Sequence, residues 1–533
     1  FWLKPFWAHA TRPQHFEHTP PPEPTACGLA VAMRLSLGRL VLLLAVEPAA
    51  SAALKWFGWG CCPRKKEPNV ARAQGPELEQ LFAEGEQVNG LLAGPPEVVL
   101  ERGPGMDPTW LARFPLSTRG RHVVDAHGDR FRLRGVNWYG AHMVHHVVGG
   151  LDTQRLDVIC ESIRQLGFNV VRMPFSHVML RLGGVVASGI DFEKNPELQG
   201  LSPLEVLDKV IWCLGKHSIA VVLNSHTTYA DWVGGPDSNS LWFDPGNAEY
   251  SEEHWMRDWA ALAGRYRNFP HVVGVDLRNE VRFCPKPLRF PTEKQSSCFG
   301  PSWPKAALKC AERVLAQSPS LLIVVERIVW PAGSLGPYVQ ALLPRLQGRL
   351  VLAVHHYSWM GPGRYLPMGN LVTTGWKGKA KPVLRCCGVL SKKNWGDMCP
   401  EELMKQLSGQ WGDELKNDVV PVWVSEFGTG PQPGYDLDWF ERFVACLGAL
   451  DADYAYWPLN VGPKPDGGGD EFYGFLGPDW KPKPEGDPRL ALMTASGLLP
   501  ADPQPPDPLP SDPLPSDPLP SDPLPSDPLP SDP

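Results

Sequence analysis

The chain has 533 residues, of which 43% are hydrophobic and 20% are charged, a composition typical of a globular protein rather than a disordered or fibrous one. Its formal net charge is −7, and the seven Asp residues after Ala501 account for all of it, so the remainder of the chain is near neutral. A near-neutral chain lacks the concentrated basic surface that phosphate binding needs, which excludes nucleic acid as a partner. The sequence contains 21 Trp, whose flat rings suit sugar surfaces as well as protein cores.

The N-terminal part contains the pattern of a secretion signal. A basic segment, Met33–Arg39, precedes an apolar run at 40–46 and the small residues Ala-Ala-Ser-Ala at 49–52. This order is typical of a secretory signal peptide. The run is far shorter than the roughly 20 residues that a membrane-spanning helix needs. We therefore expect residues 33–52 to be a signal peptide, the protein to be secreted and no stable membrane span to form; a signal anchor is the alternative.

The remaining terminal segments are expected to lie outside the main folded domain. Residues 1–32 are expected to be an upstream segment, either untranslated or the edge of a fragment, and residues 53–114 an N-terminal extension. Five copies of Asp-Pro-Leu-Pro-Ser fill residues 507–531. Proline at every second or third position prevents helix and sheet, so residues 498–533 are expected to form an extended, disordered tail or linker.

Residues 115–497 alternate between apolar runs and segments with helical periodicity. The apolar runs predict eight strands, at 131–136, 169–174, 220–224, 272–277, 321–325, 350–354, 421–424 and 454–457. Helical spacing predicts helices at 156–166, 202–214, 252–267 and 305–317. The second of these helices opens on Ser202-Pro-Leu-Glu205, a capping box with proline at the first helical position.

Near-continuous apolar strands separated by helices predict a parallel sheet that is covered on both faces. Eight such units favour an α/β fold of the (β/α)8 TIM-barrel type with loop insertions. An open doubly wound sheet is the alternative. That fold would place a Gly-rich turn after the first strand, but Gly135-Val-Asn-Trp-Tyr-Gly140 is not GxGxxG.

Polar and aromatic residues follow nearly every predicted strand, at the end where barrel active sites gather. The residues at these ends are Trp138, Arg172, His226, Asn279, Glu280, Glu326, His355, His356, Tyr357, Glu426 and Trp457. Taken singly, each is compatible with a structural role, such as a salt-bridge arginine or a core histidine. Their occurrence together at equivalent positions predicts an active site.

These strand ends resemble glycoside hydrolase family 5, the cellulase-like retaining glycosidases with (β/α)8 barrels. The matching motifs are Leu133-Arg-Gly-Val-Asn-Trp138, Asn169-Val-Val-Arg-Met-Pro174, His226, Gly274-Val-Asp-Leu-Arg-Asn-Glu280, His355-His-Tyr357, Ser425-Glu-Phe-Gly428 and Trp457. The Asn-Glu pair after the fourth strand and the Glu after the seventh are specific in combination. Two residues depart from the family pattern: Val281 stands where Pro is usual, and Arg327 where many relatives have Gly.

The resemblance implies that Glu280 is the catalytic acid and base and that Glu426 is the nucleophile. Retaining hydrolysis needs two such carboxyl groups about 5–5.5 Å apart. The resemblance further implies substrate-binding and supporting roles for Arg172, His226, Asn279, His355, Tyr357, Trp457 and Trp138. Arg172 and Tyr357 can donate hydrogen bonds to an ionised Glu426. No metal and no cofactor is required.

The expected activity is endo-acting hydrolysis of β-1,4-glucan, with a β-linked polysaccharide or oligosaccharide as the partner and a monomeric enzyme. A β-mannanase, another β-glucanase or a transglycosylase on the same barrel are alternatives, as is a glycan-binding protein without turnover. Tryptophans in loops after the strands are candidate sugar platforms, although they could equally cover the barrel rim: Trp232, Trp242, Trp330 and Trp359.

Two groups of cysteines lie in loop-like sequence, namely Cys284, Cys298 and Cys310, and Cys386, Cys387 and Cys399. In a secreted protein, such groups favour one or two disulfides that staple loops, although the pairing is not deducible. A zinc site is the competing interpretation. It is disfavoured because the spacings lack a CxxC…CxxC pattern and no His accompanies them.

Overall fold

The computed structural model describes residue 100 and residues 105–233, 238–281, 284–285, 288–289, 303–328, 334–358, 360, 395–465 and 469–501, with only the backbone at 238, 284–285 and 288–289. The chain divides into two units, Phe1–Gln74 and Gly75–Pro533, and every described residue lies in the second. The predicted signal peptide and the Pro-rich repeats therefore lie outside the described residues.

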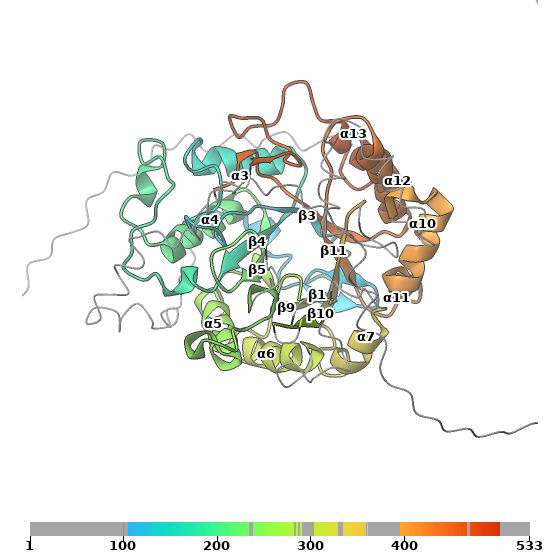
Figure 1. Ribbon diagram of the computed structural model, residues 1–533, viewed down its shortest axis with the longest axis horizontal. Coiled ribbons are helices and arrows are strands. Elements are labelled where there is room, and N and C mark those ends of the chain that lie inside the picture. Colours follow the sequence, from blue (N-terminus) through green and yellow to red (C-terminus); the bar gives the residue numbers. More distant parts are fainter. Residues whose placement is uncertain are drawn as a thin grey trace, which may run out of the picture. The chain divides into compact units, whose positions relative to one another are not determined.

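Eight parallel strands close into a barrel (Figure 1). They are β3 (Arg134–Asn137), β4 (Val170–Ser176), β5 (Ala220–Thr227), β6 (Val272–Asp276), β9 (Leu322–Glu326), β10 (Leu350–His356), β11 (Val422–Phe427) and β12 (Asp453–Tyr456). Pairing of β12 with β3 closes the ring. All eight predicted strands form, which confirms the (β/α)8 barrel and excludes the open doubly wound sheet.

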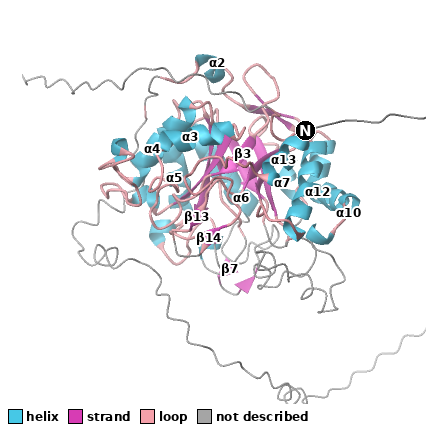
Figure 2. Cartoon of the chain, turned by 90° about the horizontal axis from the view of Figure 1, so that it is seen from above, coloured by secondary structure: helices cyan, strands magenta, loops and turns pink. Residues whose placement is uncertain are grey.

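Helices surround the strands in both views (Figures 1 and 2). The longer ones are α3 (Leu156–Gln165), α4 (Pro203–Lys216), α5 (Glu252–Arg265), α6 (Trp303–Gln317), α7 (Gly336–Leu342), α10 (Pro400–Leu407), α12 (Tyr435–Ala449) and α13 (Pro488–Ala495). The four predicted helices are α3 to α6. In the predicted capping box, the Ser202 backbone N–H donates to Glu205 at 2.8 Å. Among the described helices, none is long and apolar enough to cross a membrane.

Short elements complete the described fold. The helical ones are α2 (Pro108–Leu111), α11 (Asp413–Lys416), the π-turn Ser408–Gly412, and the 3₁₀ turns Met179–Arg181, Pro196–Leu198, Ser238–Ser240, Ala248–Tyr250 and Trp395–Asp397. Antiparallel pairs join β1 (Ser117–Arg119) to β2 (His122–Val124), β7 (Cys284–Pro285) to β8 (Leu288–Arg289), and β13 (Gly462–Pro463) to β14 (Asp470–Glu471).

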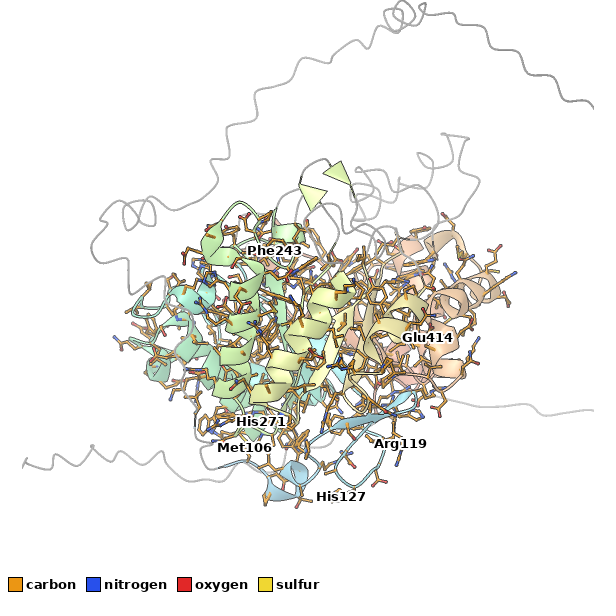
Figure 3. The ribbon with its side chains drawn as sticks, turned by 90° about the horizontal axis from the view of Figure 1, so that it is seen from below. Met106, Arg119, His127, Phe243, His271 and Glu414 are labelled. Atoms are coloured by element: carbon orange, nitrogen blue, oxygen red, sulfur yellow. The ribbon has the colours of Figure 1, made fainter. Side chains whose placement is uncertain are left out.

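The segment before β3 covers the amino-terminal end of the barrel. Trp110 and Phe114 pack with Phe131 in the same apolar cluster as the barrel interior. Figure 3 shows Arg119 and His127 of this segment at one end of the barrel, opposite Phe243 in the loop after β5. The first strand was predicted to begin at Phe131 but begins at Arg134. The Phe131 N–H instead donates to the Val123 carbonyl, which holds this residue against β2.

The strand residues that face the barrel interior are apolar near the amino end of the barrel and polar at its carboxyl end. Successive strand residues point to opposite faces, so residues two apart share a face. Val170, Val222, Val324 and Ala353 belong to the interior apolar cluster. The residues two positions further on share that face at the carboxyl end, and all are polar: Arg172, Asn224, Glu326 and His355. The two-residue alternation of strand side chains therefore forms both the apolar core and the polar site.

The described cysteines correct part of the disulfide prediction. Cys310 is buried within α6, and Cys399 is exposed at the start of α10; both are free thiols. Cys310 is therefore a core residue of a helix rather than a loop residue, and neither thiol staples a loop. The side chains of the other four cysteines in the two predicted groups lie outside the described residues.

Arg489, at the start of α13, ties the last helix to the barrel. Its fully buried guanidinium forms an ion pair with Asp487 and donates to the carbonyls of Thr429 at 2.6 Å and Gly474 at 2.8 Å. It also donates to the Tyr456 hydroxyl at 2.8 Å. Loss of this side chain would remove the buried ion-pair partner of Asp487, which would keep Lys483 at 3.2 Å, and would take a donor away from several carbonyls.

We expect Arg489→Ala to lower the free energy of unfolding by about 3–5 kcal/mol, the usual cost of removing one partner of a buried ion pair. Arg345→Ala is the matched control, because its exposed pair with Glu312 should contribute only about 0–1 kcal/mol. Urea unfolding of the two variants measures both values. Equal losses of unfolding free energy in the two variants would contradict the larger contribution expected from the buried ion pair.

Candidate active site

One buried arginine organises the carboxyl end of the barrel. Arg172 on β4 is fully buried, and its guanidinium donates to five side chains. The acceptors are Asp276 at 2.8 Å, Asn137 at 2.9 Å, Glu426 at 2.7 Å, Asn279 at 2.8 Å and Glu326 at 2.6 Å. Burial alone would lower the pKa of Arg172, but the surrounding carboxylates raise it above its ordinary value. The guanidinium therefore stays charged and fixes five neighbours at once.

Glu426 lies at the end of β11 and is 5% exposed. Its Oε1 accepts from Arg172, and its Oε2 accepts from the Tyr357 hydroxyl at 3.1 Å. Burial, together with Glu280 and Glu326, raises the pKa of Glu426 above its ordinary value, and the positive charges of His355 and Arg172 oppose that rise. The two cations thus favour the ionised carboxylate, the form that a nucleophile needs.

Glu280 follows β6 with its backbone in the left-handed region, at φ +43°. This conformation costs free energy for a residue other than glycine and is kept only where neighbours hold it. The holding contact is Glu326, whose Oε2 accepts from the Glu280 backbone N–H at 2.8 Å. The Glu280 carboxylate then reaches His355 Nδ1 at 2.9 Å.

His355 on β10 lies between three carboxylates. Its Nδ1 is 2.9 Å from Glu280 and 3.4 Å from Glu426, and its Nε2 is 3.3 Å from Glu326. Burial would lower the pKa of His355, but Glu326 and Glu426 raise it to about 10. The imidazole is therefore a cation at neutral pH.

Glu280, His355 and Glu426 each bring a donor atom to within 4.8 Å of the others. These are residue types that bind metal ions. A protonated imidazole, however, has no free lone pair, so binding a metal here would first require the removal of a strongly held proton.

Aromatic rings line one side of the site. Trp457 stacks against Tyr139 with ring centroids 5.5 Å apart and against His226 at 5.6 Å, and Trp232 meets it edge-on at 5.6 Å. A side chain at Gly428 would collide with the Trp457 carbonyl, which explains the glycine after Glu426-Phe427. His226 accompanies this aromatic group as a neutral ring, because burial holds its pKa well below the ordinary value.

The tryptophans that were predicted as candidates lie in different surroundings. Trp138 is fully buried, and its indole N–H donates to the Gly149 carbonyl at 2.9 Å. Its burial is compatible with a supporting role, one of the two kinds of role expected for this set of residues. Trp242 is also buried and covers the rim against Trp303. Trp330 and Trp359 lie outside the described residues.

The two departures from the family pattern lie in buried positions. Val281 is fully buried. Arg327 is 5% exposed, and its guanidinium donates at 3.2 Å to Gln410 of the π-turn Ser408–Gly412.

Glu326 was named among the strand-end residues but was given no role, and Asp276 was not named as a candidate, although both contact Arg172. Glu326 also supports Glu280 and His355, so it connects all parts of the site. Asp276 is fully buried, and burial together with Glu326 raises its pKa, against the opposing charge of Arg172. The signal for Asp276 was available in the sequence, because it is an acid inside the apolar run Val272–Leu277.

Comparisons with known proteins agree with this geometry. An endoglucanase from Paenibacillus polymyxa is 27% identical over 371 residues, which cover 66% of this chain and 81% of that protein. The major extracellular endoglucanase of Xanthomonas campestris pv. campestris is 35% identical over 249 residues, covering 45% of this chain and 48% of that protein.

Solved structures agree on the fold. The catalytic domain of the Xanthomonas campestris major endoglucanase has a TM-score of 0.56 at 26% identity, covering 72% of this chain and 99% of that domain. A hyperthermophilic endocellulase from Pyrococcus horikoshii has a TM-score of 0.56 at 24% identity, covering 72% of this chain and 99% of that one. The family model described as Cellulase (glycosyl hydrolase family 5) matches residues 124–462. The chain therefore belongs to the cellulase family, glycosyl hydrolase family 5.

Proposed function

We propose that the protein is an endo-acting β-1,4-glucanase that cleaves its substrate with retention of configuration. The observation that carries this proposal is the spacing of Glu280 and Glu426, which bring carboxylate oxygens to within 4.8 Å of one another. Retaining glycosidases hold their two carboxyl groups about 5–5.5 Å apart, whereas inverting enzymes leave about 6.5–9.5 Å for a water molecule. The endoglucanase names of the relatives support β-1,4-glucan as the substrate.

In the proposed first step, Glu426 attacks the anomeric carbon while Glu280 gives a proton to the leaving oxygen. In the second, Glu280 takes a proton from a water molecule while the water oxygen attacks the anomeric carbon, which breaks the bond to Glu426 and releases the sugar. Arg172 and Tyr357 hold the two Glu426 oxygens, so the attacking carboxylate is oriented before substrate arrives. His355 places a positive charge between the two carboxylates throughout the cycle.

Substrate contacts are proposed for the aromatic side of the site. Trp457 is still 6% exposed above its packed neighbours, and Trp232 is half-buried beside it. Lys464 lies 4.1 Å above the Trp232 ring centroid, which fixes the orientation of that ring. Asn279 uses its carbonyl oxygen to accept from Arg172, so its amide N–H groups can donate to a sugar hydroxyl.

We expect Glu426→Ala to be nearly inactive, because the covalent route is lost, and added azide should restore turnover through a product of inverted configuration. Glu280→Ala should still form the glycosyl-enzyme from substrates with activated leaving groups. That intermediate should accumulate, and azide should release it as a β-glycosyl azide. Rate measurements on aryl cellobiosides, with NMR of the azide products, test both outcomes.

Glu280→Ala should also lose roughly 10²–10⁴-fold on a sugar leaving group, which is the usual contribution of general acid catalysis. Glu253→Ala, at an exposed position on α5, is the control and should keep the wild-type rate. Normal rates in both site variants would mean that the two carboxylates are misassigned. Absence of hydrolysis by the wild type would favour a glycan-binding protein.

We expect His355→Asn to shift the acidic limb of the pH profile of kcat/KM to higher pH. The positive charge of His355 lowers the pKa of Glu426, so its removal raises that pKa, and Glu426 becomes protonated at a higher pH. An aryl substrate with an activated leaving group isolates this limb, and His254→Asn on α5 is the control. An unchanged limb would contradict the electrostatic role of His355.

Secretion through a signal peptide at residues 33–52 is also proposed, and the word extracellular in the name of the Xanthomonas relative supports it. The mature protein should then begin near residue 53 and accumulate outside the cell. N-terminal sequencing of the native protein tests this expectation, and a mature chain that retains residues 33–52 would contradict it.

A further inference from the structure

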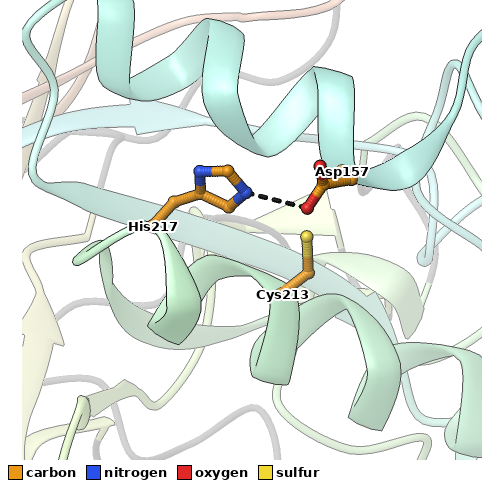
Figure 4. A group of neighbouring side chains, drawn as sticks. All are labelled: Asp157, Cys213 and His217. Atoms are coloured by element: carbon orange, nitrogen blue, oxygen red, sulfur yellow. Dashed lines mark hydrogen bonds and ion pairs between the residues drawn. The ribbon is translucent and has the colours of Figure 1, made fainter. Parts of the chain in front are cut away.

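A second group of metal-binding residue types lies away from the active site. Asp157 on α3 and Cys213 and His217 at the end of α4 each bring one donor atom to within 4.8 Å of the others. Figure 4 shows the three side chains converging between the two helices, with the His217 ring directed at Asp157. Among the described residues, the other such group is Glu280, His355 and Glu426 of the proposed active site.

Helical spacing explains why these side chains meet. Cys213 and His217 are four residues apart and so lie on one face at the end of α4. Asp157 and Glu161 have the same spacing on α3, which lies beside α4 (Figure 1). The group therefore occupies the junction of two outer helices of the barrel.

The His217 ring lies between two carboxylates. Burial would lower the pKa of His217, but Asp157 and Cys213 raise it to about 10, so a metal ion has to displace a proton from this ring, as it would at His355. The Nε2 of His217 is 3.0 Å from Asp157 Oδ1, and its Nδ1 is 3.0 Å from Glu161 Oε2. In metal sites, one ring nitrogen of a histidine binds the ion, and the other usually donates its proton to a carboxylate that fixes the ring. Here Nε2 faces Asp157, so it is the ring nitrogen that would bind an ion. Nδ1 faces Glu161, which has the position of the orienting carboxylate.

Cys213 supplies the sulfur of the group. It is 5% exposed, and its sulfur lies within 4.8 Å of the donor atoms of Asp157 and His217. The thiolate is the form of cysteine that binds metal ions. The side chain of Asp157 is 38% exposed, so the group is open to solvent at this residue. An ion and a water molecule can enter there.

We propose that Asp157, Cys213 and His217 bind a zinc ion, with Glu161 orienting His217 and water as the fourth ligand. A set of one sulfur, one nitrogen and one oxygen suits zinc, which prefers tetrahedral sites with bonds of about 2.0–2.3 Å. Ligand atoms in such a site lie roughly 3.3–3.8 Å apart, so small side-chain rotations complete it from the observed positions. The ion joins α3 to α4 and stabilises the barrel, because it binds the folded chain.

The test uses the full chain, freed of metal with EDTA and then titrated with Co²⁺, whose thiolate and tetrahedral absorption bands report on the ligands. Cysteines outside the described residues could also bind Co²⁺. The test therefore compares the amount of Co²⁺ bound by each variant with the amount bound by wild type. Wild type should bind roughly one equivalent more than Cys213→Ser, with the matching thiolate band. Cys446→Ser, which replaces a buried free thiol on α12, is the matched control and should behave as wild type.

Glu161→Gln is the most specific variant, because it keeps all three ligands. It should keep the tetrahedral spectrum while weakening zinc binding roughly 10–100-fold, the usual effect of losing an orienting carboxylate. Asp157→Asn, at the partly exposed position, provides a ligand variant even if Cys213→Ser does not fold. Zinc should raise the melting temperature of wild type more than that of either variant.

Equal cobalt binding and equal spectra in wild type, Cys213→Ser and Asp157→Asn would overturn the proposal. The three residues would then form an ion-pair and thiol cluster without metal. Hydrolysis on a short soluble substrate gives a separate readout, because the group shares no residue with the proposed active site. Removal of zinc below the melting temperature should leave turnover unchanged, whereas loss of turnover with EDTA would contradict a structural role.

Discussion

The burial of the Arg172 guanidinium among three carboxylates is the interaction on which the active site depends. A charge without solvent is costly unless it is paired and fully hydrogen-bonded, and here Asp276, Glu326 and Glu426 supply the compensation. The same contacts fix the side chains in space, so the pairing that makes burial tolerable also orients Glu426. Stability and preorganisation at this end of the barrel therefore have one cause.

Glu326 connects this arginine to the second carboxylate. It accepts from Arg172, lies 3.3 Å from His355 Nε2 and holds the left-handed Glu280 backbone. A strained backbone at a functional residue persists only where neighbours enforce it. The two carboxylates are thus positioned by one continuous set of ion pairs across β4, β6, β9, β10 and β11. Substitution within this set should disturb both carboxylates together.

Much of this arrangement was predictable from the chain, because the barrel repeats one local pattern. The eight apolar runs all became strands, and the residues at their ends converge because parallel strands end at the same side. Glu280 and Glu426 were found in this way, and the structure brings them together. Asp276 could have been found by the same method, since a carboxylate within a buried strand requires a partner.

Other details were not predictable where no local sequence pattern indicates the partner of a residue. Phe131 pairs with β2 rather than β12, and no local pattern distinguishes the two. The Trp138 indole N–H donates to the Gly149 carbonyl in a loop whose course the sequence does not indicate. The assignment of Cys310 to a loop was avoidable, because the predicted helix at 305–317 already contained this residue, and it lies on the buried face of α6. The group at Asp157, Cys213 and His217 was missed because its members come from two helices and have no motif spacing.

The central claim is that the close pair Glu280 and Glu426 cleaves the glycosidic bond by double displacement. The most direct test is ¹H NMR of the anomeric protons released by the wild-type enzyme from a soluble cello-oligosaccharide, recorded before mutarotation. The account predicts that the new reducing end appears first as the β-anomer. First appearance of the α-anomer would mean that water attacks directly, and it would contradict the assignment of Glu426 as a nucleophile.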